Sequence, residues 1–531
     1  MNIKVNRYYS FHTVNILKCY IIIVLLFIFI KCENLIRVDN SGIALKKKEF
    51  NLGEKINEII NRIKSPKNEN QKVIDNRLII VYSINDDKNE SLTRLRLKIK
   101  NLFEKSFNGI NVVDYEKLNH KDNIQEMNNG ILRYLNNLKM EIIETNNSNQ
   151  LVSFLKTINM QLLQFENLII GVYLDEYIGF EEKDTRTFIN SNKNLYLNNF
   201  SRRIDGNISN DYYYNDNNDN YYYSALYSKQ WFHSDSKYGI KSAKMWKKIS
   251  ELKNKGIGNI VIAVFDSGID FEHPDLRGKI WRNFGEYNCN DGIDDDMNGY
   301  IDDCYGWNFV NNNKIPIDDN GHGTHISGII SGIPNSIVGI SGICWYCQIM
   351  VLKVLDSKIR GLLSGFVQAI DYALDKGVRI SNHSYGSRSK NIELLRLAIK
   401  RSEEQGMLVI VASGNFENER NNDLVPTYPS SFRSDNIISV TSITSNGELM
   451  ERATYGKKSV HVGAPGVNIC STYLNGEYRC MDGSSFSAPI VTGIAGVLLS
   501  LYPNISIYSL KDCILKGVVK IKGLPAPFMN E

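Results

Sequence analysis

Residues 225–531 predict a doubly wound α/β domain, in which a mostly parallel sheet carries flanking helices. Five segments are almost continuously apolar, as expected of strands buried on both faces of a parallel sheet. They are residues 259–265, 348–355, 378–384, 407–413 and 436–443. Between them, residues 364–377 and 391–406 have apolar residues at helical spacing and end on a glycine. Sheets of this kind bind ligands beyond the carboxyl ends of their strands.

A smaller α+β domain is predicted to precede it, at residues 75–184. Residues 76–84 and 167–174 are rich in β-branched and aliphatic side chains and predict strands. Residues 91–107 and 149–162 have apolar residues at helical spacing. The expected order in this domain is therefore strand, helix, helix, strand.

The N-terminus predicts entry into the secretory pathway, with a signal peptide at residues 1–31. An uncharged run from Cys19 to Ile30 follows a short basic segment and is too short to span a bilayer comfortably. No clean small-residue cleavage site follows it, so a signal anchor that stays uncleaved is the alternative. The expected destination is secretion or a secretory organelle.

Two further segments and the charge balance complete the organisation of the chain. Residues 32–74 form a polar leader, and residues 185–224 are dominated by Asn, Asp and Tyr. Because so few apolar residues cannot offset the entropy lost when the chain becomes ordered, we expect the second segment to be an exposed linker that includes a processing region.

The formal net charge is only +4 over 531 residues, without a long basic block, which does not favour a nucleic-acid partner.

Seven of the nine cysteines lie between Cys289 and Cys513, and a secreted chain would oxidise them. Closeness in sequence suggests the disulfides Cys289–Cys304 and Cys470–Cys480. Cys344 and Cys347 could form a redox-type or a zinc-type pair, but the chain has no second such pair to complete a zinc site. Because seven is odd, at least one thiol stays free or pairs elsewhere, and Cys513 is the candidate.

Four polar residues occur where predicted strands end or helices begin. Asp266 directly follows the apolar run 259–265, and Asn415 comes just after the apolar run 407–413. His322 and Ser485 each come at the start of a segment rich in small and apolar residues. Taken singly, each is explained as a turn residue or a helix cap. Taken together at one sheet edge, they are the groups needed to activate a hydroxyl and to stabilise an oxyanion.

His322 and His325 raise the question of a zinc site. Zinc-binding helices carry two histidines at i and i+4 with a glutamate between them. These histidines stand at i and i+3 with no carboxylate on the same turn, which argues against a metal.

The four motifs in combination resemble those of the subtilisin family of serine proteases, with a general character similar to its apicomplexan branch. The matching segments are DSGID (266–270), GHGTHISG (321–328), ASGN (412–415) and GSSFSAP (483–489). The resemblance implies a secreted serine endopeptidase, made as an autoprocessed zymogen, that forms an acyl-enzyme. By this resemblance Asp266, His322 and Ser485 form the triad. Asn415 is an oxyanion donor and His325 is a packing residue.

The resemblance also implies partners and further binding residues. Residues 75–184 are similar to an inhibitory propeptide, with autocleavage beyond its last strand, in residues 180–188 or in the linker. Ser384, Tyr385 and Gly386 are expected to line the cleft for protein or peptide substrates, which pair as an added strand. A monomer is expected. Phe486 departs from the family, in which methionine usually follows the serine.

An acidic segment at residues 288–309 predicts structural calcium. Its D-x-D-x-N-G order resembles the first half of an EF-hand loop, but the twelfth position is Tyr305 rather than glutamate. The predicted ligands are Asp291, Asp294, Asp296, Asn298, Asp302 and Asp303. The alternative is a solvated acidic loop held by a disulfide.

Two other functions remain open at this point. The first is a secreted, calcium-dependent adhesion or scaffold protein built on an inactive protease fold, which is disfavoured because no triad residue is missing. The second is a metalloprotease, which the histidine spacing disfavours. The preference for substrate side chains is not apparent, although Phe416 follows Asn415 without an acidic cluster, which argues against a dibasic cleavage site.

Overall fold

The computed structural model describes most of the chain from residue 227 onward and shorter segments before it. The described residues are 55–60, 73–82, 95–99, 124–127, 130–135, 140–145, 154–155, 169–179, 187–189, 227–252, 259–334, 339–389 and 392–521. The predicted signal peptide lies outside them, as do most of the polar leader and nearly all of the Asn-rich linker.

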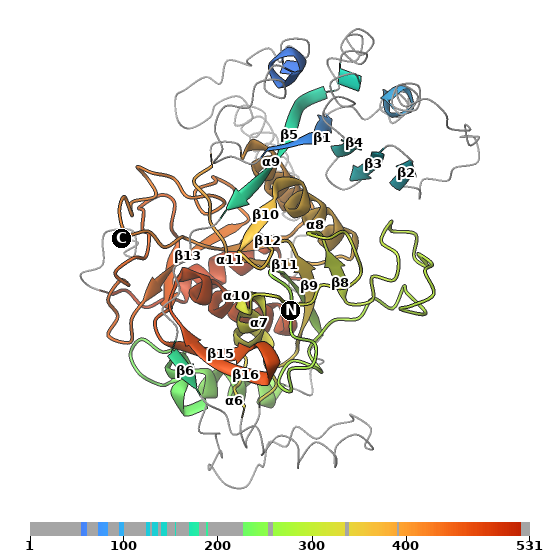
Figure 1. The fold of residues 1–531 in the computed structure, drawn as a ribbon. Helices are drawn as coiled ribbons and strands as arrows, with labels where there is room; N and C mark the ends of the chain where they lie inside the picture. Colours follow the sequence, from blue (N-terminus) through green and yellow to red (C-terminus); the bar gives the residue numbers. More distant parts are fainter. Residues whose placement is uncertain are drawn as a thin grey trace, which may run out of the picture.

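The larger domain is built on a seven-stranded sheet in which all neighbouring strands are parallel (Figure 1). In sheet order its strands are β14 (Val462–Pro465), β13 (Ile437–Ile443), β12 (Leu408–Ala412), β11 (Ile380–His383), β7 (Ile260–Asp266), β9 (Cys347–Lys353) and β8 (Gly306–Asn308). The sheet extends in both directions from β7, which is the doubly wound arrangement. The predicted fold class and all five predicted strands are confirmed.

Helices cover both faces of this sheet (Figure 1). One face packs against α8 (Leu363–Asp375) and α9 (Glu393–Glu404); the other packs against α6 (Ser242–Leu252), α7 (His322–Ser331), α10 (Ser484–Leu501) and α11 (Ile507–Lys516). Alternate side chains of β7 point to opposite faces, so Phe265 joins the first core and Val264 the second.

Helix α10 is the central helix of the second face. It packs against β11 to β14 and against α7. Among the described residues it is the one helix long and apolar enough to cross a membrane, yet 83% of it is buried inside the protein. Gly496 lets it approach the sheet, because a Cβ there would lie 2.5 Å from Cys347 Sγ. α10 is therefore a core helix, and its first turn is fixed by the packing of the whole domain.

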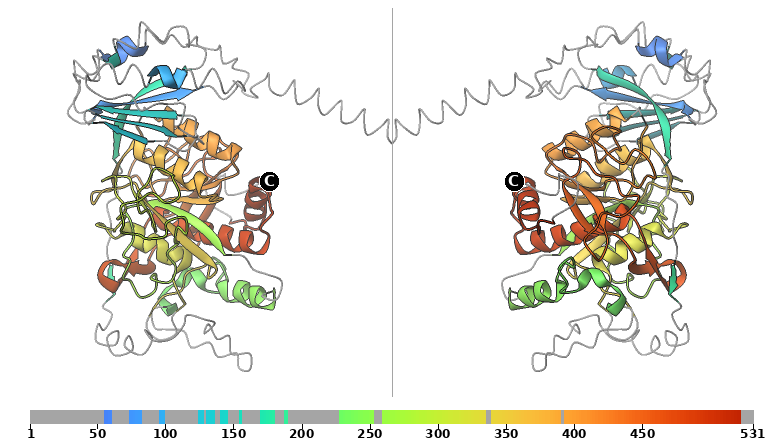
Figure 2. Two further views of the ribbon diagram at one scale, coloured as in Figure 1. Left: turned by 90° about the vertical axis from the view of Figure 1, so that its right-hand side faces the viewer. Right: turned by 90° about the vertical axis from the view of Figure 1, so that its left-hand side faces the viewer.

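The smaller domain forms an antiparallel sheet that lies against the α8 and α9 side (Figure 2). Its strands are β1 (Val73–Tyr82), β2 (Ile124–Met127), β3 (Gly130–Leu135), β4 (Met140–Thr145) and β5 (Ile169–Gly179). Both predicted strands are present as β1 and β5. Strands β2 to β4 were not predicted, and of the two predicted helices only residues 95–99 and 154–155 are described as helical.

The two domains share contacts along the end of β5. Tyr177 to Gly179 pair antiparallel with β10 (Arg360–Leu362), which makes β10 the sixth strand of the smaller domain's sheet. Ile79, Val81, Met140 and Ile142 of the smaller domain belong to the same buried core as α8. The docking of the two domains is thus both apolar and hydrogen-bonded.

A third sheet lies near the start of α7. It contains β15 (Ile469–Tyr473), β16 (Glu477–Met481) and β6 (Thr187–Ile189), which pair antiparallel in the order β15-β16-β6. The predicted disulfide Cys470–Cys480 joins β15 to β16, and the predicted disulfide Cys289–Cys304 closes the acidic loop.

The C-W-Y-C pair also forms a disulfide, Cys344–Cys347. Both of its cysteines are almost completely buried, so it is neither a zinc site nor an exposed redox pair. Cys513, the candidate for the unpaired thiol, is free, and it is exposed.

Candidate active site

Asp266 and His322 form a buried hydrogen-bonded pair at the carboxyl edge of the parallel sheet. Asp266 is the last residue of β7 and His322 the first residue of α7. His322 Nδ1 lies 2.7 Å from Asp266 Oδ1, and their side chains are 2% and 1% exposed. Burial raises the pKa of Asp266, and the hydrogen bonds from His322 and the Ser267 N–H oppose that rise. Because Nδ1 is bonded to the carboxylate, proton transfer from a hydroxyl would use Nε2.

Glycines allow the two segments to approach this closely. A Cβ on Gly323, the second residue of α7, would lie 2.2 Å from the carbonyl oxygen of Gly268. Gly268 itself has a φ of +111°, which L-amino acids with a side chain rarely adopt. The glycines of both motifs are thus required by the contact between the β7 loop and α7.

Ser485 lies in the first turn of α10, next to the histidine. It is 1% exposed, and the ring of its neighbour Phe486 lies 5.5 Å from the ring of His322. The Ser485 hydroxyl donates to the carbonyl oxygen of Ser384 at 3.1 Å, and the Ser384 hydroxyl donates to the Ser485 carbonyl at 2.7 Å. The structure therefore brings Asp266, His322 and Ser485 to one edge of the sheet from three distant parts of the chain.

Asn415 follows β12 and faces the start of α10. Its Oδ1 accepts the Ser484 N–H at 2.9 Å. Because Oδ1 is used in this way, Nδ2 is the donor side of the amide, and it would lie 3.1 Å from a Cβ on Gly483. The Asn415 amide thus lies beside the N-terminus of α10, where N–H donors could stabilise a developing oxyanion.

His325 is a packing residue, as the sequence predicted. It is completely buried, with its ring 4.7 Å from that of Phe486, and Nε2 donates to the Arg479 carbonyl at 3.0 Å. Burial lowers the pKa of His325 to about 3, so the ring is neutral. Within the described residues, the metal-capable group of side chains includes neither His325 nor His322.

Ser384, Tyr385 and Gly386 directly follow the carboxyl end of β11. The Ser384 and Tyr385 side chains are buried, and Tyr385 packs against Phe366 with ring centroids 4.6 Å apart. A Cβ on Gly386 would lie 2.8 Å from Thr427 Cγ2. Ser384 is thus in direct contact with Ser485, while the part of these three residues that could meet a substrate is the backbone.

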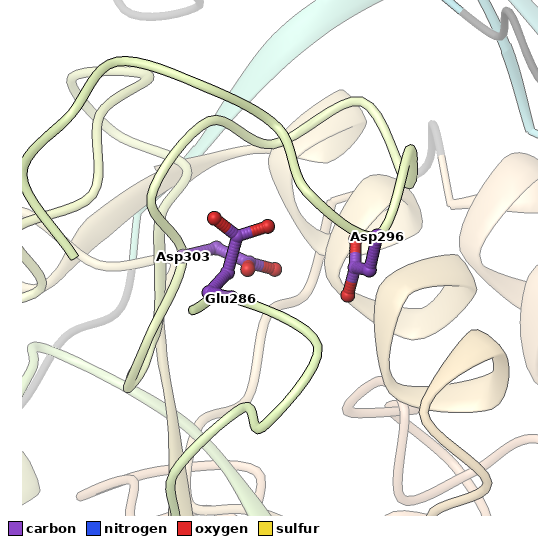
Figure 3. A group of neighbouring side chains, drawn as sticks. All are labelled: Glu286, Asp296 and Asp303. Atoms are coloured by element: carbon purple, nitrogen blue, oxygen red, sulfur yellow. The ribbon is translucent and has the colours of Figure 1, made fainter. Parts of the chain in front are cut away.

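Glu286, Asp296 and Asp303 form an acidic cluster in the loop before β8 (Figure 3). Each offers a carboxylate oxygen within 4.8 Å of the other two. Glu286 is 1% exposed, and neither of its oxygens has a hydrogen-bond partner among the described residues. Burial raises the pKa of Glu286 to about 7; the charges of Asp303 and Asp296 add to that rise, and the nearby backbone N–H of Asp296 opposes it. Lys376 Nζ bonds to Asp296 Oδ2 on one side of the cluster.

The chemistry of these donors fits a hard cation. Calcium prefers carboxylate oxygens, and a buried carboxylate without hydrogen bonds is costly unless a cation compensates it. Of the six predicted ligands, Asp296 and Asp303 lie in this cluster, whereas Glu286 was missed. Glu286 stands before Cys289 and outside the D-x-D-x-N-G pattern. The only sequence signal for it is that the predicted disulfide brings this segment back beside Asp303.

The other predicted ligands have different contacts. Asp294 accepts the N–H groups of Asn298 and Gly299, which makes the tight turn that the D-x-D-x-N-G pattern predicted. Asn298 Nδ2 donates to Asp303 Oδ2 at 2.8 Å. Asp302 pairs with a lysine, Lys314, at 2.8 Å, and Asp291 accepts a backbone N–H at 3.0 Å. These residues shape the loop around the cluster.

The fold and the site together define a class of protein. A doubly wound parallel sheet that carries an aspartate–histidine pair, a serine at a helix N-terminus and an amide donor has the parts of a serine hydrolase. The match to a known family is specific, because the Peptidase_S8 family model, described as the subtilase family, matches residues 258–525. The chain belongs to the subtilase family.

Several curated relatives are similar to the same part of the chain. Subtilisin-like protease 1 of Plasmodium berghei is 34% identical over 313 residues, which cover 56% of this chain and 52% of that protein. Subtilisin-like protease 2 of Plasmodium falciparum is 34% identical over 257 residues, covering 48% of this chain and 18% of that protein. Thermitase of Thermoactinomyces vulgaris is 33% identical over 239 residues, covering 45% of this chain and 74% of that protein.

The chain spans about half the length of the first Plasmodium relatives that it matches. Their presence agrees with the apicomplexan character of the sequence. Among solved structures, a cold-adapted subtilisin-like serine proteinase aligns with a TM-score of 0.38 and 22% identity, over 49% of this chain and 82% of that chain.

Proposed function

We propose that this chain is a secreted serine endopeptidase that hydrolyses peptide bonds through an acyl-enzyme and is made as an autoprocessed zymogen. The observation that carries the proposal is the buried 2.7 Å bond between His322 Nδ1 and Asp266 Oδ1, next to the α10 N-terminus that bears Ser485. Membership of the subtilase family and the names of the relatives support the same activity.

In the proposed reaction Ser485 Oγ attacks the carbonyl carbon of the scissile peptide bond, while His322 Nε2 takes the hydroxyl proton. Asp266 holds the imidazole in the correct tautomer and stabilises the imidazolium that forms. The tetrahedral oxyanion accepts hydrogen bonds from Asn415 Nδ2 and the Ser485 N–H. His322 then protonates the leaving amine, and a water molecule hydrolyses the acyl-enzyme in the same way.

The substrate is a peptide that binds in extended form. β10 already pairs antiparallel with β5, so its edge accepts an extended strand beside the Asp266 loop. Ser384 to Gly386 provide a second backbone edge next to Ser485. Strand addition gives affinity through main-chain hydrogen bonds, which suits an enzyme that acts on polypeptides.

Residues 75–184 act as an inhibitory propeptide in this proposal. The end of β5 occupies the β10 edge where substrate would pair. Asp175 accepts hydrogen bonds from the Ser364 N–H at 2.8 Å and from Arg77 at 3.1 Å, which fixes β5 to the start of α8. The predicted cleavage stretch begins directly after Gly179, and its residues 180–186 lie outside the described residues. On the N-terminal side of these residues the end of β5 pairs with β10, and on their C-terminal side β6 pairs with β16. β10 and β16 belong to different sheets.

Calcium is proposed as a structural ion held by Glu286, Asp296 and Asp303. Its charge would compensate the three carboxylates and hold the disulfide-closed loop against the α8 side of the domain. The ion takes no part in the proposed chemistry. The three disulfides favour the same oxidising compartment as the predicted signal peptide.

The test compares the processed wild-type protein with Ser485→Ala. A serine-directed fluorophosphonate probe should label the wild type and not the variant, and peptide hydrolysis should disappear with the label. Equal labelling of both proteins, or hydrolysis that survives in Ser485→Ala, would refute the proposal. Absence of labelling and hydrolysis in the wild type would instead favour an inactive scaffold or adhesion protein.

A further inference from the structure

One buried carboxylate outside the predicted triad accepts an unusual number of hydrogen bonds. Asp318 is 6% exposed and accepts five hydrogen bonds from the residues around it. Its Oδ1 accepts from Ser267 Oγ (2.8 Å), Asn320 N (3.0 Å) and Gly321 N (2.9 Å), and its Oδ2 accepts from Thr324 N (2.9 Å) and Thr324 Oγ1 (2.6 Å). The five donor groups come from four residues, and both oxygens of Asp318 act as acceptors, which an amide side chain could not match.

These donors belong to the two segments that carry Asp266 and His322. Ser267 follows Asp266, and its N–H donates to Asp266 Oδ1 at 2.8 Å. The Ser267 hydroxyl donates to Asp318 and accepts the Gly323 N–H at 3.0 Å, directly after His322. Asp318 and Ser267 therefore form a hydrogen-bonded bridge between the β7 loop and α7, behind the Asp266–His322 bond.

Asp318 also completes the N-terminus of α7. The N-cap residue Gly321 has no side chain to accept the first N–H groups of the helix. Asp318 takes over this function from three residues upstream, since it accepts the N–H groups of Gly321 and Thr324. A negative charge at a helix N-terminus also interacts favourably with the helix dipole.

We propose that Asp318 is a positioning residue for the Asp266–His322 pair. It fixes the start of α7 relative to the β7 loop, and so sets where the His322 imidazole stands between Asp266 and Ser485. This inference rests on the proposed proteolytic function. The sequence offered no signal for it, because Asp318 lies in a polar loop and outside the four motifs.

The expected consequence follows from the position of Asp318. It is not at the β10 edge or in the segment of Ser384 to Gly386, so its loss should leave peptide binding nearly unchanged. A misplaced imidazole lowers the rate of the chemical step, for which an error of about 1 Å can cost about 10²-fold. The Asp318 carboxylate also adds negative charge near Asp266. Loss of the Asp318 charge should therefore disfavour the imidazolium form of His322.

The test uses Asp318→Asn in the full chain, processed as in the wild type, with a peptide substrate and fluorophosphonate titration of active sites. The control is Asp423→Asn. Asp423 also bridges two loops, accepting the Lys458 N–H and the Ser459 N–H and hydroxyl, but it is exposed and belongs to no part of the site. Both substitutions remove one charge and several hydrogen bonds.

For Asp318→Asn we expect kcat per titrated site to fall by about 10- to 100-fold, with KM within about threefold of wild type. The acid limb of its kcat/KM profile should move to lower pH, because the imidazolium has lost a neighbouring negative charge. Asp423→Asn should keep both kcat and the acid limb. A kcat per titrated site within about threefold of wild type, or an acid limb that does not move, would overturn the inference.

A second variant separates the bridge from the charge. Ser267→Ala removes the link between Asp318 and the β7 loop but keeps the carboxylate, so it should lower kcat without moving the acid limb. The double variant should lose less than the product of the two single losses, because both act on one bridge. Fully multiplicative losses would count against a shared bridge. Loss of activity in Ser485→Ala, with wild-type kcat in these variants, would refute this inference and leave the proposed protease intact.

Discussion

The larger domain contains two groups of carboxylates that differ in how completely the chain supplies their hydrogen bonds. Around the candidate triad, Asp266 Oδ1 and both oxygens of Asp318 accept hydrogen bonds from the imidazole, two hydroxyls and several backbone N–H groups, and only Asp266 Oδ2 has no hydrogen-bond partner among the described residues. In the acidic cluster, both oxygens of Glu286 are buried without a hydrogen-bond partner among the described residues, and Lys376 forms an ion pair with Asp296 but not with Glu286 or Asp303 among the described residues.

The difference indicates whether each group of carboxylates requires a bound cation to compensate its charge. A carboxylate group that the chain itself satisfies is already organised and can hold another side chain in place. A group left with uncompensated charge is complete only when a cation arrives. The comparison therefore predicts large losses of rate from changes in the first region and losses of metal-dependent stability from changes in the second.

The largest expected effect is that of Asp266→Asn. The amide would favour the wrong tautomer of His322, and kcat should fall by about 10⁴-fold, as in the trypsin-like enzymes, with little change in KM. Steady-state kinetics on the processed enzyme, with thermal unfolding as a check on the fold, would measure this. A loss below about tenfold would show that Asp266 does not orient the imidazole.

A smaller loss of rate is expected for Asn415→Ala. Removal of the Nδ2 donor should lower kcat by roughly 10² to 10³-fold, which is the known cost of removing the corresponding donor from a subtilisin and is carried over to this chain by family membership. KM should change little, because the donor acts on the oxyanion rather than on the bound peptide. A variant that keeps kcat within about threefold would exclude Asn415 from oxyanion stabilisation.

In the acidic cluster, Glu286→Gln should remove metal-dependent stability. Excess chelator should lower the Tm of the wild type by about 5 °C or more, because an ion that binds only the folded state stabilises it. The chelator effect should be less than about half as large in Glu286→Gln. Differential scanning calorimetry with and without calcium would measure both values.

Asp291→Asn is the matched control for this measurement. It removes the same charge from the same loop, but Asp291 accepts a backbone N–H and lies outside the cluster. Its chelator effect should stay close to that of the wild type. If Asp291→Asn loses the effect while Glu286→Gln keeps it, the ion would be bound through Asp291 and not through Glu286, and the proposed cluster would be wrong.

The smallest effect concerns the neutral histidine beside the triad. Burial lowers the pKa of His325 to about 3 from the ordinary value of 6.5, so the unfolded chain binds one more proton than the folded protein between these values. This contribution to stability is complete above pH 6.5 and is lost as the pH falls toward 3. His325→Gln should reduce the slope of unfolding free energy against pH in this window by about one proton. An unchanged slope in denaturant titrations would show that His325 is charged in the folded protein.

The sequence can place the residues of the candidate triad on the fold because each is attached to a strong periodic element. Asp266 ends a continuous apolar strand, and Ser485 begins a long apolar helix, so the fold class alone places both at one sheet edge. Asn415 follows another buried strand of the same sheet. Here local pattern and tertiary position agree.

The sequence fails where position depends on how a loop returns on itself. Glu286 and Asp318 lie in irregular segments, and their burial results from contacts made far along the chain, with Asp303 and Ser267. The strands β2 to β4 were missed for a related reason. β4 is only six residues long and breaks the period of two with Ile142 and Ile143, and its buried Met140 and Ile142 belong to the core shared with the larger domain.

Ser485 lies at the N-terminus of a buried core helix, and this position ties the proposed activity to complete folding of the domain. The proposed nucleophile meets its proposed partners only where α10 packs against both the sheet and α7, so a half-folded copy would have the hydroxyl without the groups that activate it. In the proposed protease, newly made chains would therefore be inactive while they are still folding. Heating that disrupts the packing of α10 should inactivate the proposed enzyme, without first producing an active form that lacks the propeptide's inhibition.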